Sequence, residues 1–127
     1  MITTLLLDLD ETLCDTTGAN NKALALLAEK FNQLFAQTSV AEGQAFAQAY
    51  IQGIYRELDE RYQALLLPVE NEEAFRLQLI ALICSDMGIA DIPQETALQL
   101  QRCFDDARTA FFDFFPGIES WLAQLRQ

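Results

Sequence analysis

The chain has 127 residues, of which 51% are hydrophobic and 21% charged, a composition that indicates one ordinary globular domain. Nineteen acidic against eight basic side chains give a formal net charge of −11, so the chain repels a phosphate backbone and nucleic-acid binding is not expected. The sequence contains no histidine, which excludes His-activated nucleophiles and His-containing zinc sites. Any chemistry must therefore rest on carboxylates.

The cellular location is inferred from hydropathy and cysteine usage. No apolar run approaches the roughly 18 residues that a membrane helix needs, and no secretory signal is present. The three cysteines, Cys14, Cys84 and Cys103, are widely spaced and odd in number, which is typical of reduced thiols that pack as small hydrophobic residues. We expect a cytoplasmic protein with no membrane partner.

The first part of the chain predicts a strand followed by two helices. The continuous apolar run Ile2–Leu7 is typical of a strand buried on both faces, and Asp8–Asp15 is expected to form a polar turn. Apolar residues then recur at helical spacing and predict a first helix over about 17–37. Ser39 with Glu42 forms a capping box, which starts a second helix that we expect to continue to Leu65 and to stop before Pro68.

Three further helices are predicted. Asn71 is the expected N-cap of a third helix that extends to Met87, with Gly88 after its end. Pro93 is expected to open a fourth helix, and Pro116-Gly117 precedes a final one. The predicted fold is therefore mainly α, with one N-terminal strand and about five helices.

The single predicted strand has no partner in this sequence. Each unpaired backbone group on its two edges costs about 1 to 3 kcal/mol where water is excluded. We therefore expect the partner strands to come from residues absent from this chain or from another molecule, and we interpret the chain as incomplete relative to its fold.

The candidate chemistry lies where that strand ends, in the segment Asp8-Leu9-Asp10-Glu11-Thr12-Leu13. In extended backbone, residues two apart project to the same side, so Asp8 and Asp10 can address one point at the strand's carboxyl edge, where open α/β sheets bind ligands. Two neighbouring carboxylates without a cationic partner favour a bound divalent cation, and hard oxygen ligands suit Mg²⁺.

This segment resembles the first signature motif (DxDxT) of the haloacid dehalogenase (HAD) superfamily, which consists mainly of Mg²⁺-dependent phosphatases. Phe115-Pro116-Gly117-Ile118, after a helical insertion, resembles the subfamily with an α-helical cap inserted after the first core strand. The resemblance implies that residues 1–15 and 114–127 belong to a partial α/β catalytic core. It also implies that residues 16–113 form a helical-bundle cap.

The resemblance also implies roles for individual residues. Asp8 would be the nucleophile that forms an aspartyl-phosphate, and Asp10 the general acid and base. Asp8 would also bind Mg²⁺ through one carboxylate oxygen and Asp10 through its main-chain carbonyl, and Thr12 would support the loop. Thr16 and Asn20 would approach the leaving group of a small phosphorylated metabolite; alternatively, they are a loop residue and an exposed polar residue at a helix start.

Two departures from the family pattern limit what the resemblance implies. Glu11 stands where the family often has glycine. The family's second to fourth motifs are not found in residues 1–127, so we expect this chain alone to lack the phosphate clamp and part of the metal site. The alternative is a non-enzymatic, truncated helical module that forms a homodimer or binds a partner chain, such as a missing C-terminal core segment.

Overall fold

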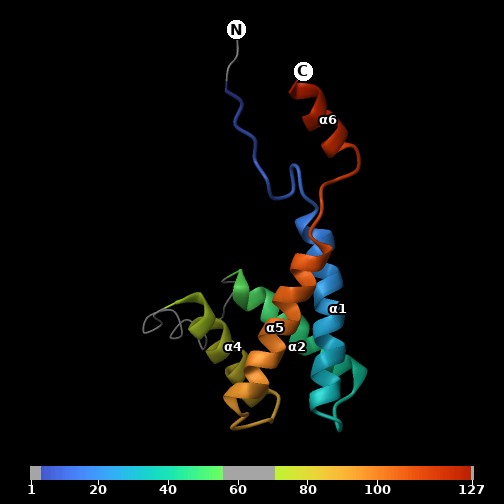
Figure 1. Ribbon diagram of the computed structural model, residues 1–127. Helices are drawn as coiled ribbons and strands as arrows, with labels where there is room; N and C mark the ends of the chain where they lie inside the picture. The colour runs from blue at the N-terminus through green and yellow to red at the C-terminus, as the bar shows by residue number, and fades with distance from the viewer. Residues whose placement is uncertain (1–3, 56–70, 127) are drawn as a thin grey trace.

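The computed structural model describes residues 4–55 and 71–126, and within these ranges the protein is mainly helical (Figure 1). Helices α1, α2, α4 and α5 pack into a bundle, in which α1 contacts both α2 and α5 and α4 contacts α2 and α5. No helix in the described ranges combines the length and apolar character needed to cross a bilayer. The helices are α1 (Thr16–Leu34), α2 (Val40–Ile54), α4 (Glu72–Asp86), α5 (Gln94–Phe111) and α6 (Ile118–Leu125).

The helix starts follow the capping signals of the sequence. The capping box is formed by Ser39 and Glu42, each of whose side chains bonds the backbone N–H of the other, and the side chain of Asn71 accepts a hydrogen bond from Ala74 N. Gly88 has a φ of +83° just after α4, a conformation that suits glycine. The predicted starts of the second and third helices are therefore confirmed.

Two of the predicted helix ends have no matching helix end in the described residues. The first helix ends at Leu34, before the predicted Gln37, because Thr38 turns the chain by bonding the Phe35 carbonyl through its N–H and its hydroxyl. The predicted end of the second helix, at Leu65 before Pro68, lies outside the described residues, which stop at Tyr55 on that side.

Aromatic rings hold the centre of the bundle together. Phe31 of α1 stacks on Phe46 of α2 with ring centroids 4.4 Å apart, and Tyr50 of α2 meets Phe104 of α5 edge-on at 5.4 Å. Burial raises the pKa of the Tyr50 hydroxyl far above its usual value, so this group stays neutral. These four rings therefore join three helices through buried apolar contact.

An ion pair links α4 to α5 next to this core. The Arg76 guanidinium of α4 lies 2.6 Å from the Asp105 carboxylate of α5 and 3.3 Å from Glu72 one turn earlier on its own helix. The Arg76 side chain is largely buried, while both carboxylates are more exposed. The pair thus ties the outer helix to α5 beside the apolar core.

The chain enters and leaves the bundle at one place. Asp15 N donates to the Asp113 carbonyl and Phe115 N donates to the Leu13 carbonyl, both at 2.9 Å, so residues 13–15 and 113–115 pair in antiparallel fashion. Beyond these paired segments, residues 4–12 and helix α6 both extend away from the same end of the bundle (Figure 1). None of the residues of α6 is buried.

The predicted buried strand is not formed in the described residues. Residues 4–9 have no regular secondary structure, and Leu5, Leu6 and Leu7 are exposed, Leu6 to 90%. The reason is physical: a strand exists only where a second strand accepts its backbone hydrogen bonds, and residues 4–55 and 71–126 provide none for this segment. The prediction of a buried strand is therefore wrong for the described part of this segment, residues 4–7.

Candidate functional site

Residues 8–13 form a tight loop next to the paired segments 13–15 and 113–115. The Leu9 carbonyl accepts hydrogen bonds from Leu13 N at 3.0 Å and Cys14 N at 2.9 Å, and Glu11 N donates to the Cys14 carbonyl at 3.0 Å. Glu11 takes a φ of +58°, a left-handed conformation that favours glycine. Because Leu13 and Cys14 are buried, the loop has a fixed base on the bundle.

Each of the two candidate carboxylates is held by a threonine hydroxyl. Thr12 Oγ1 donates to Asp8 Oδ2 at 2.9 Å, and Thr16 Oγ1 donates to Asp10 Oδ1 at 3.1 Å. Asp8 and Asp10 are both exposed, whereas Thr16 is buried in the first turn of α1. One hydrogen bond therefore stays within the loop, and the other links it to the bundle.

Two further carboxylates satisfy backbone donors at the start of α1. Asp15 Oδ1 accepts from Gly18 N at 2.8 Å as the N-cap, and Glu11 Oε1 accepts from Thr17 N. Such donors have no partner within the helix, and the positive end of its dipole favours negative charge. The loop and the helix start are thus joined at adjacent residues, Asp10 to Thr16 and Glu11 to Thr17.

Asn20 lies one turn beyond Thr16 on the same face of α1, and it is buried, with only 7% of its surface exposed. The alternative that it is an exposed polar residue is therefore wrong. Asn20 Nδ2 donates to the Tyr55 hydroxyl at 2.8 Å, while Asn20 Oδ1 is buried without a hydrogen-bond partner among the described residues. A buried amide oxygen without a hydrogen-bond partner lowers the stability of the fold. Asn20 Oδ1 is therefore an acceptor that a further donor could satisfy.

The loop offers oxygen ligands that could hold part of a Mg²⁺ shell. Within residues 4–55 and 71–126, no three His, Cys, Asp or Glu side chains converge on a point that could hold a metal. Asp8 nevertheless keeps one carboxylate oxygen that is not engaged with Thr12, and the Asp10 main-chain carbonyl, the metal ligand that the resemblance implies, is a second oxygen of the kind that Mg²⁺ prefers. These two oxygens would supply part of a Mg²⁺ ligand set and leave the rest to other ligands.

Cys14 does not offer a rival nucleophile. Its side chain is buried, and burial, together with the Asp10 and Asp113 carboxylates, raises the pKa of its thiol. The thiol thus stays protonated near neutral pH. Cys84 is also buried, and all three cysteines are free, so the prediction of reduced, packed thiols is confirmed for Cys14 and Cys84.

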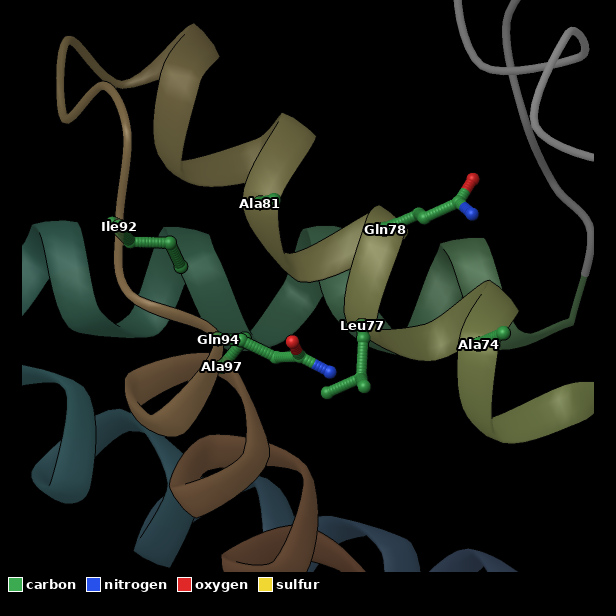
Figure 2. A pocket seen from close by; sticks show the side chains of 7 residues that line it. All are labelled: Ala74, Leu77, Gln78, Ala81, Ile92, Gln94 and Ala97. Carbon is green, nitrogen blue, oxygen red and sulfur yellow. The ribbon is translucent and has the colours of Figure 1, made fainter.

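A cavity of about 320 Å³ lies between α4 and the start of α5, away from the acidic loop (Figure 2). The described residues that line it are apolar or small apart from two amides, Gln78 and Gln94. None of these residues carries a titratable or nucleophilic side chain, so we do not assign a catalytic role to this cavity.

Sequence reasoning missed two contacts of the site. The bond from Glu11 to Thr17 could have been suspected, because a carboxylate shortly before a helix start often caps it. The bond between Asn20 and Tyr55 joins residues 35 apart and has no local signal.

Comparison with models of known protein families, with curated proteins and with solved structures found no significant match.

Proposed function

We propose that this chain provides the nucleophile loop and the helical cap of a HAD-like, Mg²⁺-dependent phosphate monoester hydrolase. The observation that carries the proposal is that Asp10 is anchored to the first turn of α1 through Thr16, while Asp8 stands exposed two residues earlier. This arrangement supports a pair of exposed carboxylates, each of them oriented by a threonine hydroxyl. The proposed core, residues 1–15 and 114–127, and the proposed cap, residues 16–113, meet where the two crossing segments pair.

Asp8 is the nucleophile of the proposed reaction. One of its oxygens attacks phosphorus, the bond to the leaving oxygen breaks, and an aspartyl-phosphate forms. Its second oxygen keeps the hydrogen bond from Thr12, which orients the carboxylate for the attack. Hydrolysis of the acyl phosphate then returns the free carboxylate and inorganic phosphate.

Asp10 transfers the protons. It donates a proton to the departing alcohol and later takes one from the water that attacks the aspartyl-phosphate. Thr16 holds one oxygen of Asp10, so the other is the oxygen that moves the proton. When bound by Asp8 and Asp10, Mg²⁺ supplies positive charge that offsets the charge of the transferring phosphoryl group.

The proposed substrate is a small phosphorylated metabolite whose leaving group lies near the start of α1. Thr16 and Asn20, one turn apart on the same face of α1, are the residues proposed to lie near that leaving group, and Asn20 Oδ1 is a buried acceptor without a partner among the described residues. The phosphate clamp and the remaining metal ligands are, in this proposal, provided by a further polypeptide segment.

Turnover tests this proposal. The protein tagged and purified from its natural source, with everything joined or bound to it, is expected to release p-nitrophenol from p-nitrophenyl phosphate in Mg²⁺ but not in EDTA. The recombinant 127-residue chain is expected to be inert, because it lacks the clamp. A natural preparation that hydrolyses neither this ester nor a panel of sugar and nucleoside monophosphates contradicts the proposal.

The exposed leucines of residues 4–9 favour a second candidate function, a non-enzymatic module that self-associates or binds a partner chain. Leu5, Leu6, Leu7 and Leu9 are all at least 40% exposed, and α6, which extends from the same end of the bundle (Figure 1), buries none of its residues. Under this candidate, sedimentation of the 127-residue chain shows concentration-dependent association, and Leu6→Glu abolishes it with an unchanged helical circular-dichroism spectrum. A monomer at all concentrations, which also captures no partner, counts against it.

A further inference from the structure

Glu11 combines an unfavourable backbone conformation with a side-chain bond that explains it. A residue with a Cβ at a φ of +58° is strained, and glycine would fit there at no cost. The Glu11 carboxylate, however, accepts the hydrogen bond of Thr17 N, which glycine cannot do. The strain therefore coincides with a contact between the loop and the first turn of α1.

This contact lies beside the one that fixes Asp10. Asp10 and Glu11 are adjacent in the loop, and their partners, Thr16 and Thr17, are adjacent in α1. Because two side-chain hydrogen bonds join the loop to α1, the loop cannot rotate about one of them without breaking the other. If the Glu11 bond is removed, the backbone hydrogen bonds of the loop remain, but the Asp10 carboxylate keeps only the bond from the Thr16 hydroxyl to orient it among the described residues.

We propose that Glu11 is a positioning residue, whose carboxylate clasps the loop to the N-terminus of α1 and thereby fixes the orientation of Asp10. The inference rests on the proposed function for its consequence, metal binding and proton transfer by Asp10, but the clasp itself is a property of the folded chain. Support from a residue that does not itself bind the metal commonly changes metal affinity by about 10- to 100-fold.

Three substitutions separate the clasp from the backbone strain. Glu11→Gln keeps an oxygen acceptor for Thr17 N, Glu11→Gly removes the acceptor and relieves the strain, and Glu11→Ala removes the acceptor and keeps the strain. Glu42→Ala is the matched control, because Glu42 Oε2 accepts from Ser39 N at the start of α2, at the opposite end of the bundle (Figure 1). It removes an equivalent capping bond far from the loop.

The first readout needs no metal. In NMR spectra of the 127-residue chain, we expect the nuclear Overhauser contacts between the Thr16 methyl and the Asp10 β-protons, and slow amide exchange at Thr17. Both are expected to be lost in Glu11→Gly and Glu11→Ala, to be kept in Glu11→Gln, and to be unchanged in Glu42→Ala. Unchanged contacts and exchange in Glu11→Gly overturn the inference.

The second readout is Mn²⁺ affinity, measured by paramagnetic broadening of the loop resonances. Glu11→Gly and Glu11→Ala are expected to weaken it about 10- to 100-fold, and Glu11→Gln and Glu42→Ala to leave it nearly unchanged. If the parent chain binds Mn²⁺ through Asp10 and Glu11→Gly binds it equally well, the positioning role is wrong. If the parent chain binds no Mn²⁺ while the NMR contacts respond as expected, the clasp stands, and metal binding then requires the ligands that the proposed function assigns to the further segment.

Discussion

Asp8→Asn is expected to abolish phosphate-ester hydrolysis by the natural preparation. An amide oxygen is a poor nucleophile, so no aspartyl-phosphate forms, and loss of the nucleophile in a serine protease lowers kcat on the order of 10⁶-fold. Asp10→Asn removes only the proton transfer, which is typically worth about 10²- to 10⁴-fold. The measurement is the rate of p-nitrophenol release in Mg²⁺, with acid-quenched mass spectrometry of the peptide that contains Asp8 to detect the phosphoryl group.

The matched control for both variants is Asp91→Asn. Asp91 has a φ of +54°, which asparagine tolerates well, and it lies in the loop between α4 and α5 at the opposite end of the bundle (Figure 1). Asp91→Asn changes the net charge equally and is expected to leave the rate unchanged. Activity that survives Asp8→Asn would show that the hydrolysis arises elsewhere, and the assigned nucleophile would then be wrong.

Phe31→Ala is expected to lower the free energy of unfolding by about 3 to 5 kcal/mol. The Phe31 ring is fully buried between Phe46 of α2 and Phe35, so its removal leaves a cavity at the α1–α2 contact and ends the stacking. Urea unfolding followed by circular dichroism measures the change. We expect a lower midpoint and an unchanged slope, because the same surface is exposed on unfolding.

The control for this variant is Leu26→Ala on the same helix. Leu26 is 39% exposed and its contact with Cys103 uses only its backbone carbonyl, so we expect a cost of about 0.5 kcal/mol. If both variants cost the same, the aromatic centre is not what holds α1 and α2 together, and the packing described for the bundle is wrong.

The local signals of the sequence predicted the helices well. The capping box of Ser39 and Glu42, the Asn71 cap and the glycine after α4 all act within a few residues, so neighbouring letters suffice to find them. Phe46 and Tyr50 are four residues apart, a spacing that places them on one face of α2, and both are fully buried.

Features that depend on distant residues could not be predicted in the same way. The apolar segment before Asp8 has a strand pattern, but a strand also needs a partner, and the described residues contain none. At the candidate site, Asp8 and Asp10 were selected from their spacing and from the resemblance, and their roles stay a prediction. The burial of Asn20 depends on its contact with Tyr55 from another helix, and the left-handed φ of Glu11 depends on closure of the loop onto the bundle.

The antiparallel pairing of residues 13–15 with 113–115 has a topological consequence. The helical bundle begins and ends at two backbone segments joined by hydrogen bonds of 2.9 Å, so its ends span almost no distance. A unit with this geometry can be inserted into a surface turn of another protein without forcing the host chain apart. For the same reason, a short linker between residues 15 and 113 would produce a circularly permuted bundle with new ends in one of its other loops.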